Sequence, residues 1–174
     1  MIQEVTEALI RLFQAKVHEH TLLIVPDDVF EVKKTPSILL QGPMLSEDRH
    51  RRVVGTTFKN NLADMTAEES SHPRLYHLDF DLIVTTAHES ELLNFQERIA
   101  AFFISTPVVE IAESGALNLT EISPLGSLSR VNLSNLKQSS GKIRIEDCPV
   151  FAGELTTGKL VSKINIQLSP FNSR

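Results

Sequence analysis

One stretch of this chain constrains its fold more than any other, because its side chains alternate between apolar and polar. The apolar positions are Tyr76, Leu78, Phe80, Leu82 and Val84, and the polar positions between them include His77, Asp79 and Asp81. Successive side chains of a β-strand point to opposite faces of a sheet. The pattern therefore predicts a strand that is buried on one face and polar on the other, with only Ile83 out of place.

Two segments have the three- and four-residue apolar spacing of amphipathic helices. The first covers residues 2–17, where Val5, Leu9 and Phe13 recur among polar residues. The second has Ser90 as a plausible N-cap and repeats Leu92, Leu93, Ile99, Phe102 and Phe103 until Pro107, which cannot continue a helix. We expect both helices to pack on one face of the sheet.

Further strands are expected at short apolar or β-branched runs bounded by turn residues. These runs are residues 22–25, stopped by Pro26; 37–41, stopped by Gly42-Pro43; 51–58; 108–111; and 117–122. Residues 125–138 suit either a short helix or an irregular covering loop. Residues 60–74 have almost no apolar repeat, so we expect an exposed loop there.

The C-terminal part of the chain has the pattern of a long β-hairpin over residues 142–169. Alternating residues that include Leu160, Ile164 and Ile166 follow a turn-like sequence at 156–159. A two-stranded ribbon is barely stable alone, so it should add to the main sheet or pair with a neighbouring subunit. We therefore expect a single α+β domain over residues 1–174, with a mixed, mainly antiparallel sheet, two amphipathic helices on one face and this hairpin.

Composition excludes several classes of function. The chain has 174 residues with 17 basic and 22 acidic side chains, and a net charge of −5 argues against binding nucleic acid through its phosphates. Cys148 is the only cysteine, so no intrachain disulfide can form. The start of the chain lacks the pattern of a secretory signal, and no apolar run is long enough to span a membrane. We expect a soluble cytoplasmic protein without a membrane partner.

One partial motif is best explained by turn composition. Gly153, Gly158 and Lys159 match most of the phosphate-binding P-loop pattern, but Leu160 stands where the magnesium-binding hydroxyl belongs. The following residues alternate as a strand, whereas a P-loop leads into a helix. We expect no catalytic residue, no cofactor and no metal.

The row of His77, Asp79 and Asp81 permits two interpretations. Alternate residues on one strand face lie about 7 Å apart, so an imidazole and two carboxylates could contribute to a metal or acid/base site. Such a row is more often a solvated face or a subunit contact. The first interpretation gives an alternative function, a small α+β metal-binding or enzyme domain that uses these three residues.

A basic cluster is formed by Arg49, Arg51 and Arg52. It could bind an acidic partner surface or a backbone phosphate. Since Glu47 and Asp48 directly precede it, the cluster is more often a face that compensates its own charge.

The order of these elements resembles that of phage tail-terminator proteins, and the caps of contractile injection systems are similar. The resemblance depends on the N-terminal helix around Val5–Ile10, the run Arg74–Leu82, the helix start Glu89–Leu93 and the closing hairpin. It implies a small mixed sheet with helices on one face. It also implies a ring, six copies in that family, that caps the tail tube, stops its polymerisation and meets head-completion proteins on its other side.

The resemblance implies a structural assembly protein and not an enzyme. The protein would be cytoplasmic before assembly and part of a virion or injection particle afterwards, with DNA passing through the ring without specific binding. Candidate contacts to other copies or partners are Arg49, Arg51, Arg52, His77, Asp79, Asp81, Leu160, Ile164 and Ile166.

Overall fold

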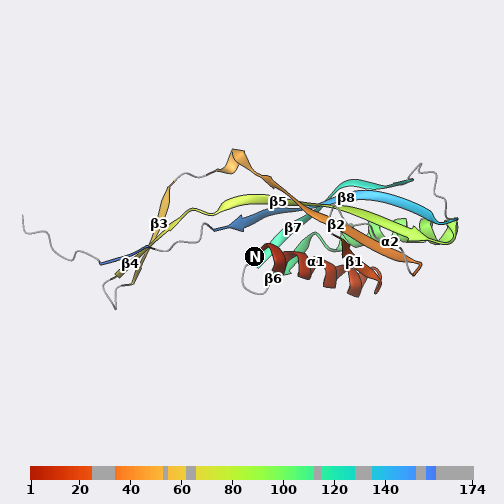
Figure 1. Cartoon of the computed structure of the whole chain (residues 1–174), viewed down its shortest axis with the longest axis horizontal. Helices are drawn as coiled ribbons and strands as arrows, with labels where there is room; N and C mark the ends of the chain where they lie inside the picture. Colours follow the sequence, from red (N-terminus) through yellow and green to blue (C-terminus); the bar gives the residue numbers. More distant parts are fainter. Residues whose placement is uncertain are drawn as a thin grey trace, which may run out of the picture. The chain divides into compact units, whose positions relative to one another are not determined.

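A computed structural model of the chain describes residues 1–24, 34–52, 55–61, 66–111, 115–127, 135–151 and 156–159 (Figure 1). Contacts divide the chain into two units, and the single domain expected from the sequence stays a prediction. The first unit comprises Met1–Arg52 and Arg74–Val150, and the second comprises Val53–Pro73 and Phe151–Arg174.

Strands of the first unit form one mixed sheet. In the described part of this unit its order is β1-β2-β5-β8-β7-β6. The bounds are β1 Thr21–Ile24, β2 Ser37–Glu47, β5 Arg74–Thr86, β8 Lys137–Val150, β7 Gly115–Ser127 and β6 Val108–Ile111. β1 runs parallel to β2, and every other neighbouring pair is antiparallel. The predicted α+β class with a mixed, mainly antiparallel sheet is confirmed.

The alternating stretch that dominated the sequence is the central strand β5. Leu78, Phe80, Leu82 and Val84 are each at most 1% exposed, whereas the intervening residues are only half-buried. Phe80 lies opposite Ile143 of β8, which is also fully buried. Apolar pairs across neighbouring strands thus form the floor of the core.

Helices α1 (Ile2–Lys16) and α2 (Glu89–Ser105) cover that face of the sheet. Their contact includes the rings of Phe13 and Phe102, whose centroids are 4.8 Å apart. The predicted N-cap at Ser90 is wrong, because the helix begins at Glu89 and His88 is the N-cap. No side-chain cap bond forms there, but Glu89 and Glu91 place negative charge at the positive end of the helix dipole.

Strand β2 does not stop at Gly42-Pro43 as the sequence suggested, but continues to Glu47. A bulge shifts its register against β5 between Gln41 and Met44, and the Gly42-Pro43 peptide is cis. A bulge leaves residues out of the hydrogen-bond ladder, so it can hold a proline without ending the strand.

The second unit corrects two expectations. Within residues 60–74, expected to be a loop, β4 (Thr66–Ser71) pairs with β3 (Thr56–Asn61). The turn expected at 156–159 is instead strand β9 (Thr156–Lys159), which pairs with β4 and gives the order β3-β4-β9. These strands are identified by the pairing of their backbones. Their sequences lack the alternation of apolar and polar residues from which a strand could be predicted.

Three remaining expectations fall partly outside the described residues. Of the hairpin at 142–169, the first strand belongs to β8, which pairs with β5 and β7. Leu160, Ile164 and Ile166 lie beyond the described residues. The strand expected at 51–58 begins only at Thr56, after a short 3₁₀ helix, η1 (Arg49–Arg51). In 125–138, the structure has strand at 125–127 and 137–138 and does not describe 128–134.

Candidate functional site

The face of the sheet away from the helices carries the predicted row of polar residues. Asp79 and Asp81 lie opposite Arg144 and Lys142 of β8 in the strand register. Arg144 donates two hydrogen bonds to Asp79, at 2.6 and 2.9 Å, and Lys142 lies 3.5 Å from Asp81. The hydrogen bond to Asp79 raises the pKa of the Arg144 guanidinium. Both carboxylates are therefore paired with cations.

His77, the third member of the row, lies opposite Ser46 of β2 and next to a register shift between β5 and β8. Its Nδ1 is buried and has no hydrogen-bond partner among the residues that the structure describes. Across the described residues, no group of three or more His, Cys, Asp and Glu side chains is arranged to hold a metal ion. The geometry gives the metal-site interpretation no support.

The basic cluster lies on and after η1, where acidic side chains compensate most of it. Arg51 donates to Asp147 at 2.6 Å, and Arg52 lies 3.8 Å from Glu47. Asp147 reaches this position from a backbone with φ of 59°, a conformation that Asp tolerates better than most residues. Arg49 is exposed and makes no ion pair with the described residues. A partner would meet a mixed patch in which Arg49 is the arginine without an ion pair to the described part of the chain.

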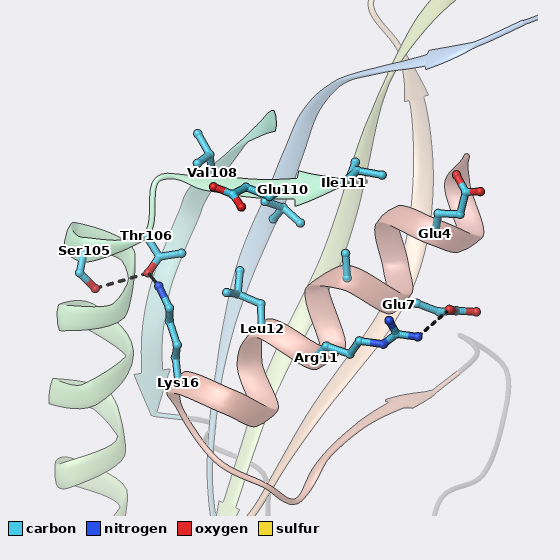
Figure 2. Close-up of a pocket in the computed structure, with 12 residues that line it drawn as sticks. Glu4, Glu7, Arg11, Leu12, Lys16, Ser105, Thr106, Val108, Glu110 and Ile111 are labelled. Atoms are coloured by element: carbon cyan, nitrogen blue, oxygen red, sulfur yellow. Dashed lines mark hydrogen bonds and ion pairs between the residues drawn. The ribbon is translucent and has the colours of Figure 1, made fainter. Parts of the chain in front are cut away.

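A groove between α1 and β6 was not anticipated from the sequence. It encloses about 820 Å³, and Figure 2 shows Leu12 pointing from α1 toward β6. Its other lining residues are Glu4, Glu7, Ala8, Arg11 and Lys16 of α1, Ser105 and Thr106, and Val108–Ile111 of β6. Lys16 Nζ donates to Thr106 Oγ1 at 3.0 Å and closes one end. The only feature of the sequence related to this groove was the short strand predicted directly after Pro107.

Both outer strands of the sheet, β1 and β6, have one side without a neighbouring strand in the parts of the chain described. Such an edge presents unpaired backbone N–H and C=O groups that another strand can bind. On β1, Leu22 is 44% and Leu23 39% exposed, so this edge also offers apolar side chains.

Helix α2 exposes apolar side chains as well. Leu93, expected on its buried face, is 61% exposed, and Ile104 is 85% exposed. Cys148 is buried, and burial raises the pKa of its thiol, so its thiolate is disfavoured. The described surface is thus rich in contact groups and has no assembled nucleophile.

No family model matches the chain, and no curated protein is similar to it in sequence. Its fold is similar to that of the PVC sheath/tube terminator of an extracellular contractile injection system, determined by cryo-EM in the extended state. The TM-score is 0.63 at 13% sequence identity, and the match covers 100% of this chain and 65% of that chain. The chain therefore shares its fold with this protein, in agreement with the fold that the resemblance in the sequence implied, and spans about 65% of that protein's length.

Proposed function

We propose that this chain is a structural assembly protein that terminates the tail tube of a phage, prophage or injection system. The observation that carries the proposal is the fold, which matches a sheath/tube terminator along the whole chain. Copies of the chain form a ring, six in the resembling family, that caps the tube and stops its polymerisation. The other side of the ring meets head-completion or capping proteins.

The surfaces of the first unit suit this role. Ring closure requires a contact between two different patches of neighbouring copies, repeated with the correct rotation. The unit offers open strand edges at β1 and β6 and exposed apolar side chains at Leu93 and Ile104. An acidic net charge of −5 suits a ring through which DNA passes without sticking.

The protein acts in the cytoplasm before assembly and as part of the particle afterwards. None of the described helices is long and apolar enough to cross a lipid bilayer.

The test is electron microscopy of the purified chain, alone and with the tube protein encoded beside it. We expect rings, tubes capped at one end, and a tube-length distribution that broadens when the chain is omitted. Tubes whose length and ends are indifferent to the chain would contradict the proposal. So would a gene neighbourhood without tube, sheath or tape-measure genes.

The triple substitution to alanine distinguishes the proposed function from the alternative, a metal-binding or enzyme domain that uses His77, Asp79 and Asp81. The ion pairs of both carboxylates speak against it. We expect the triple variant to keep tube-length control and to bind no less Zn²⁺, Mn²⁺ or Mg²⁺ than the parent. Stoichiometric metal that is bound by the parent and lost in the triple variant would favour the alternative.

A further inference from the structure

Strand β6 ends the described sheet, so one of its sides has no neighbouring strand among the described residues, and all four of its residues line the groove. Leu119 N–H donates to Pro107 C=O, which sets the phase of the antiparallel ladder with β7. Hydrogen-bonded and non-hydrogen-bonded positions alternate along such a ladder. Val109 and Ile111 therefore bond to β7, while the N–H and C=O groups of Val108 and Glu110 point away from it.

The groove next to this edge has the form that one added strand requires. Val109 and Ile111 are buried, at 1% and 8% exposure, so one face of a strand added to β6 would turn toward α1. Ala8 and Leu12 of α1, both partly buried at the margin of the core, would meet that face. The opposite face of the added strand would be on the same side of the sheet as the side chains of Val108 and Glu110. Glu110 is exposed and makes no ion pair within the described residues.

The chain itself carries a segment with the matching pattern. Beyond Lys159, the end of β9, there are 15 more residues, and they begin with the alternating sequence Leu-Val-Ser-Lys-Ile-Asn-Ile-Gln-Leu. Leu160, Ile164, Ile166 and Leu168 fall on one face of an extended strand and Lys163 falls on the other. Residues 160–174 contain Lys163 and Arg174 but no acidic side chain, so Lys163 complements Glu110.

We propose that the groove between α1 and β6 receives residues 160–168 of a second copy of this chain as an added strand. The apolar face of that strand packs on Ala8 and Leu12, its backbone bonds to Val108 and Glu110, and its Lys163 lies on the side of Glu110. This inference rests on the proposed function for the existence of a ring, and it names the contact that links successive copies. A segment of one copy that enters a groove on the next copy makes a head-to-tail contact, the kind that closes rings.

The first experiment removes one donor from the free edge. Glu110→Pro deletes an N–H that β7 does not use, and an edge strand tolerates proline on its open side. Glu110→Thr is the matched control, because it removes the same charge and keeps the N–H. We expect Glu110→Pro to weaken self-association about tenfold or more in sedimentation, the effect of about 1.4 kcal/mol, and Glu110→Thr to weaken it less. Equal effects of the two variants would overturn the inference, as would no effect of either.

The second experiment identifies the occupant. Full chains carrying Glu110→Cys are mixed with full chains carrying Lys163→Cys and treated with a short bismaleimide; the parent, with buried Cys148, controls for background. Glu97→Cys on α2, outside the groove, replaces Glu110→Cys in the matched control. We expect a covalent dimer with Glu110→Cys and little with Glu97→Cys. Equal yields, or a cross-link only within one chain that carries both cysteines, would contradict a donated strand from a second copy.

The same samples separate this inference from the proposed function. Rings or capped tubes that lack the 110–163 cross-link would overturn the added strand and leave a terminator intact. A chain that forms neither rings nor caps, whatever its cross-links, would count against the terminator itself.

Discussion

The two faces of the six-stranded sheet are built from alternate residues of the same strands and follow different physical rules. On the face covered by α1 and α2, Phe80 and its neighbours in β5 are sealed from water. On the open face, Asp79 and Asp81 stay half-buried and are matched by cations of β8. A single strand thus contributes a core residue and a charged surface residue in turn.

The difference between the faces shows which face stabilises the fold and which face is available to a partner. Burying an apolar side chain stabilises the fold by about 1.5–3 kcal/mol, whereas an ion pair open to water contributes about 0–1 kcal/mol. Substitutions should therefore be costly on the covered face and mild on the open face. The open face can change its charges to suit a partner without unfolding the molecule.

The largest effect is expected from Phe80→Ala on the covered face. Phe80 is fully buried, and its truncation leaves a cavity beneath both helices, so we expect a loss of about 3–5 kcal/mol in the free energy of unfolding. Urea denaturation followed by circular dichroism measures it. Ile122→Ala, at a position that is 44% exposed, is the control and should cost less than about 1 kcal/mol. Similar losses in the two variants would break the contrast between the faces.

A substitution in the bulge of β2 should lower the stability of the protein nearly as much. Gly42 has φ of +151°, and a Cβ there would lie 2.8 Å from the Asp79 carbonyl oxygen and 2.9 Å from the Phe80 ring. We expect Gly42→Ala to destabilise the protein by about 2 kcal/mol or more. Gly126→Ala is the matched control, since its added methyl group meets nothing within 4 Å. Thermal melts that shift equally for both variants would show that the bulge is not a tight contact.

A smaller effect is expected from the ion pairs of the open face. Double-mutant cycles with alanine should give a coupling of about 1 kcal/mol for Asp79–Arg144, which shares two hydrogen bonds. The Asp81–Lys142 pair is more exposed and 3.5 Å long, so its coupling should be about 0.3 kcal/mol and vanish in 1 M salt. A larger coupling for Asp81–Lys142 would contradict this ranking.

The smallest effect concerns Glu121, which follows Leu117 and Leu119 on the covered side of β7 and lies opposite Ile143. Burial raises its pKa above the ordinary value of 4.5. The folded state then holds the proton more tightly than the unfolded state, so stability falls as the pH rises from 4.5 through the raised pKa.

Glu121→Gln removes this ionisation and tests the sign. The variant should have a higher urea midpoint than the parent at pH 7, and the difference should shrink as the pH falls below 4.5. A difference that is independent of pH would show that packing, and not the charge, separates the two proteins.

Much of the first unit could be predicted from the sequence. The period of two in 76–84 and the helical spacing in 2–17 survive in the structure, because each pattern reports burial on one face of a regular element. Leu93 was placed wrongly, because the helical spacing around it cannot say where the apolar stripe ends. The turn at Gly42-Pro43 was wrong, because whether a proline ends a strand or enters a bulge depends on the neighbouring strand.

The candidate site was harder to predict. The row of His77, Asp79 and Asp81 could be found from its spacing, but its ion pairs could not, since Arg144 lies 65 residues from Asp79 in the sequence. The groove between α1 and β6 left no motif, because it is made by the distance between two elements and not by a residue type.

By itself, the amino-acid sequence determined which faces of α1, α2 and β5 turn inward and which class of fold contains them. Local patterns of apolar side chains carry that information, because burial acts on each residue in turn. Only the tertiary structure decided which strands are neighbours, that β9 joins β4, that the acidic row is neutralised and that β6 is left at an edge. Those outcomes depend on backbone hydrogen bonds and charge pairs between distant segments. Because nearly every residue offers the same backbone groups, these contacts leave no local pattern in the sequence.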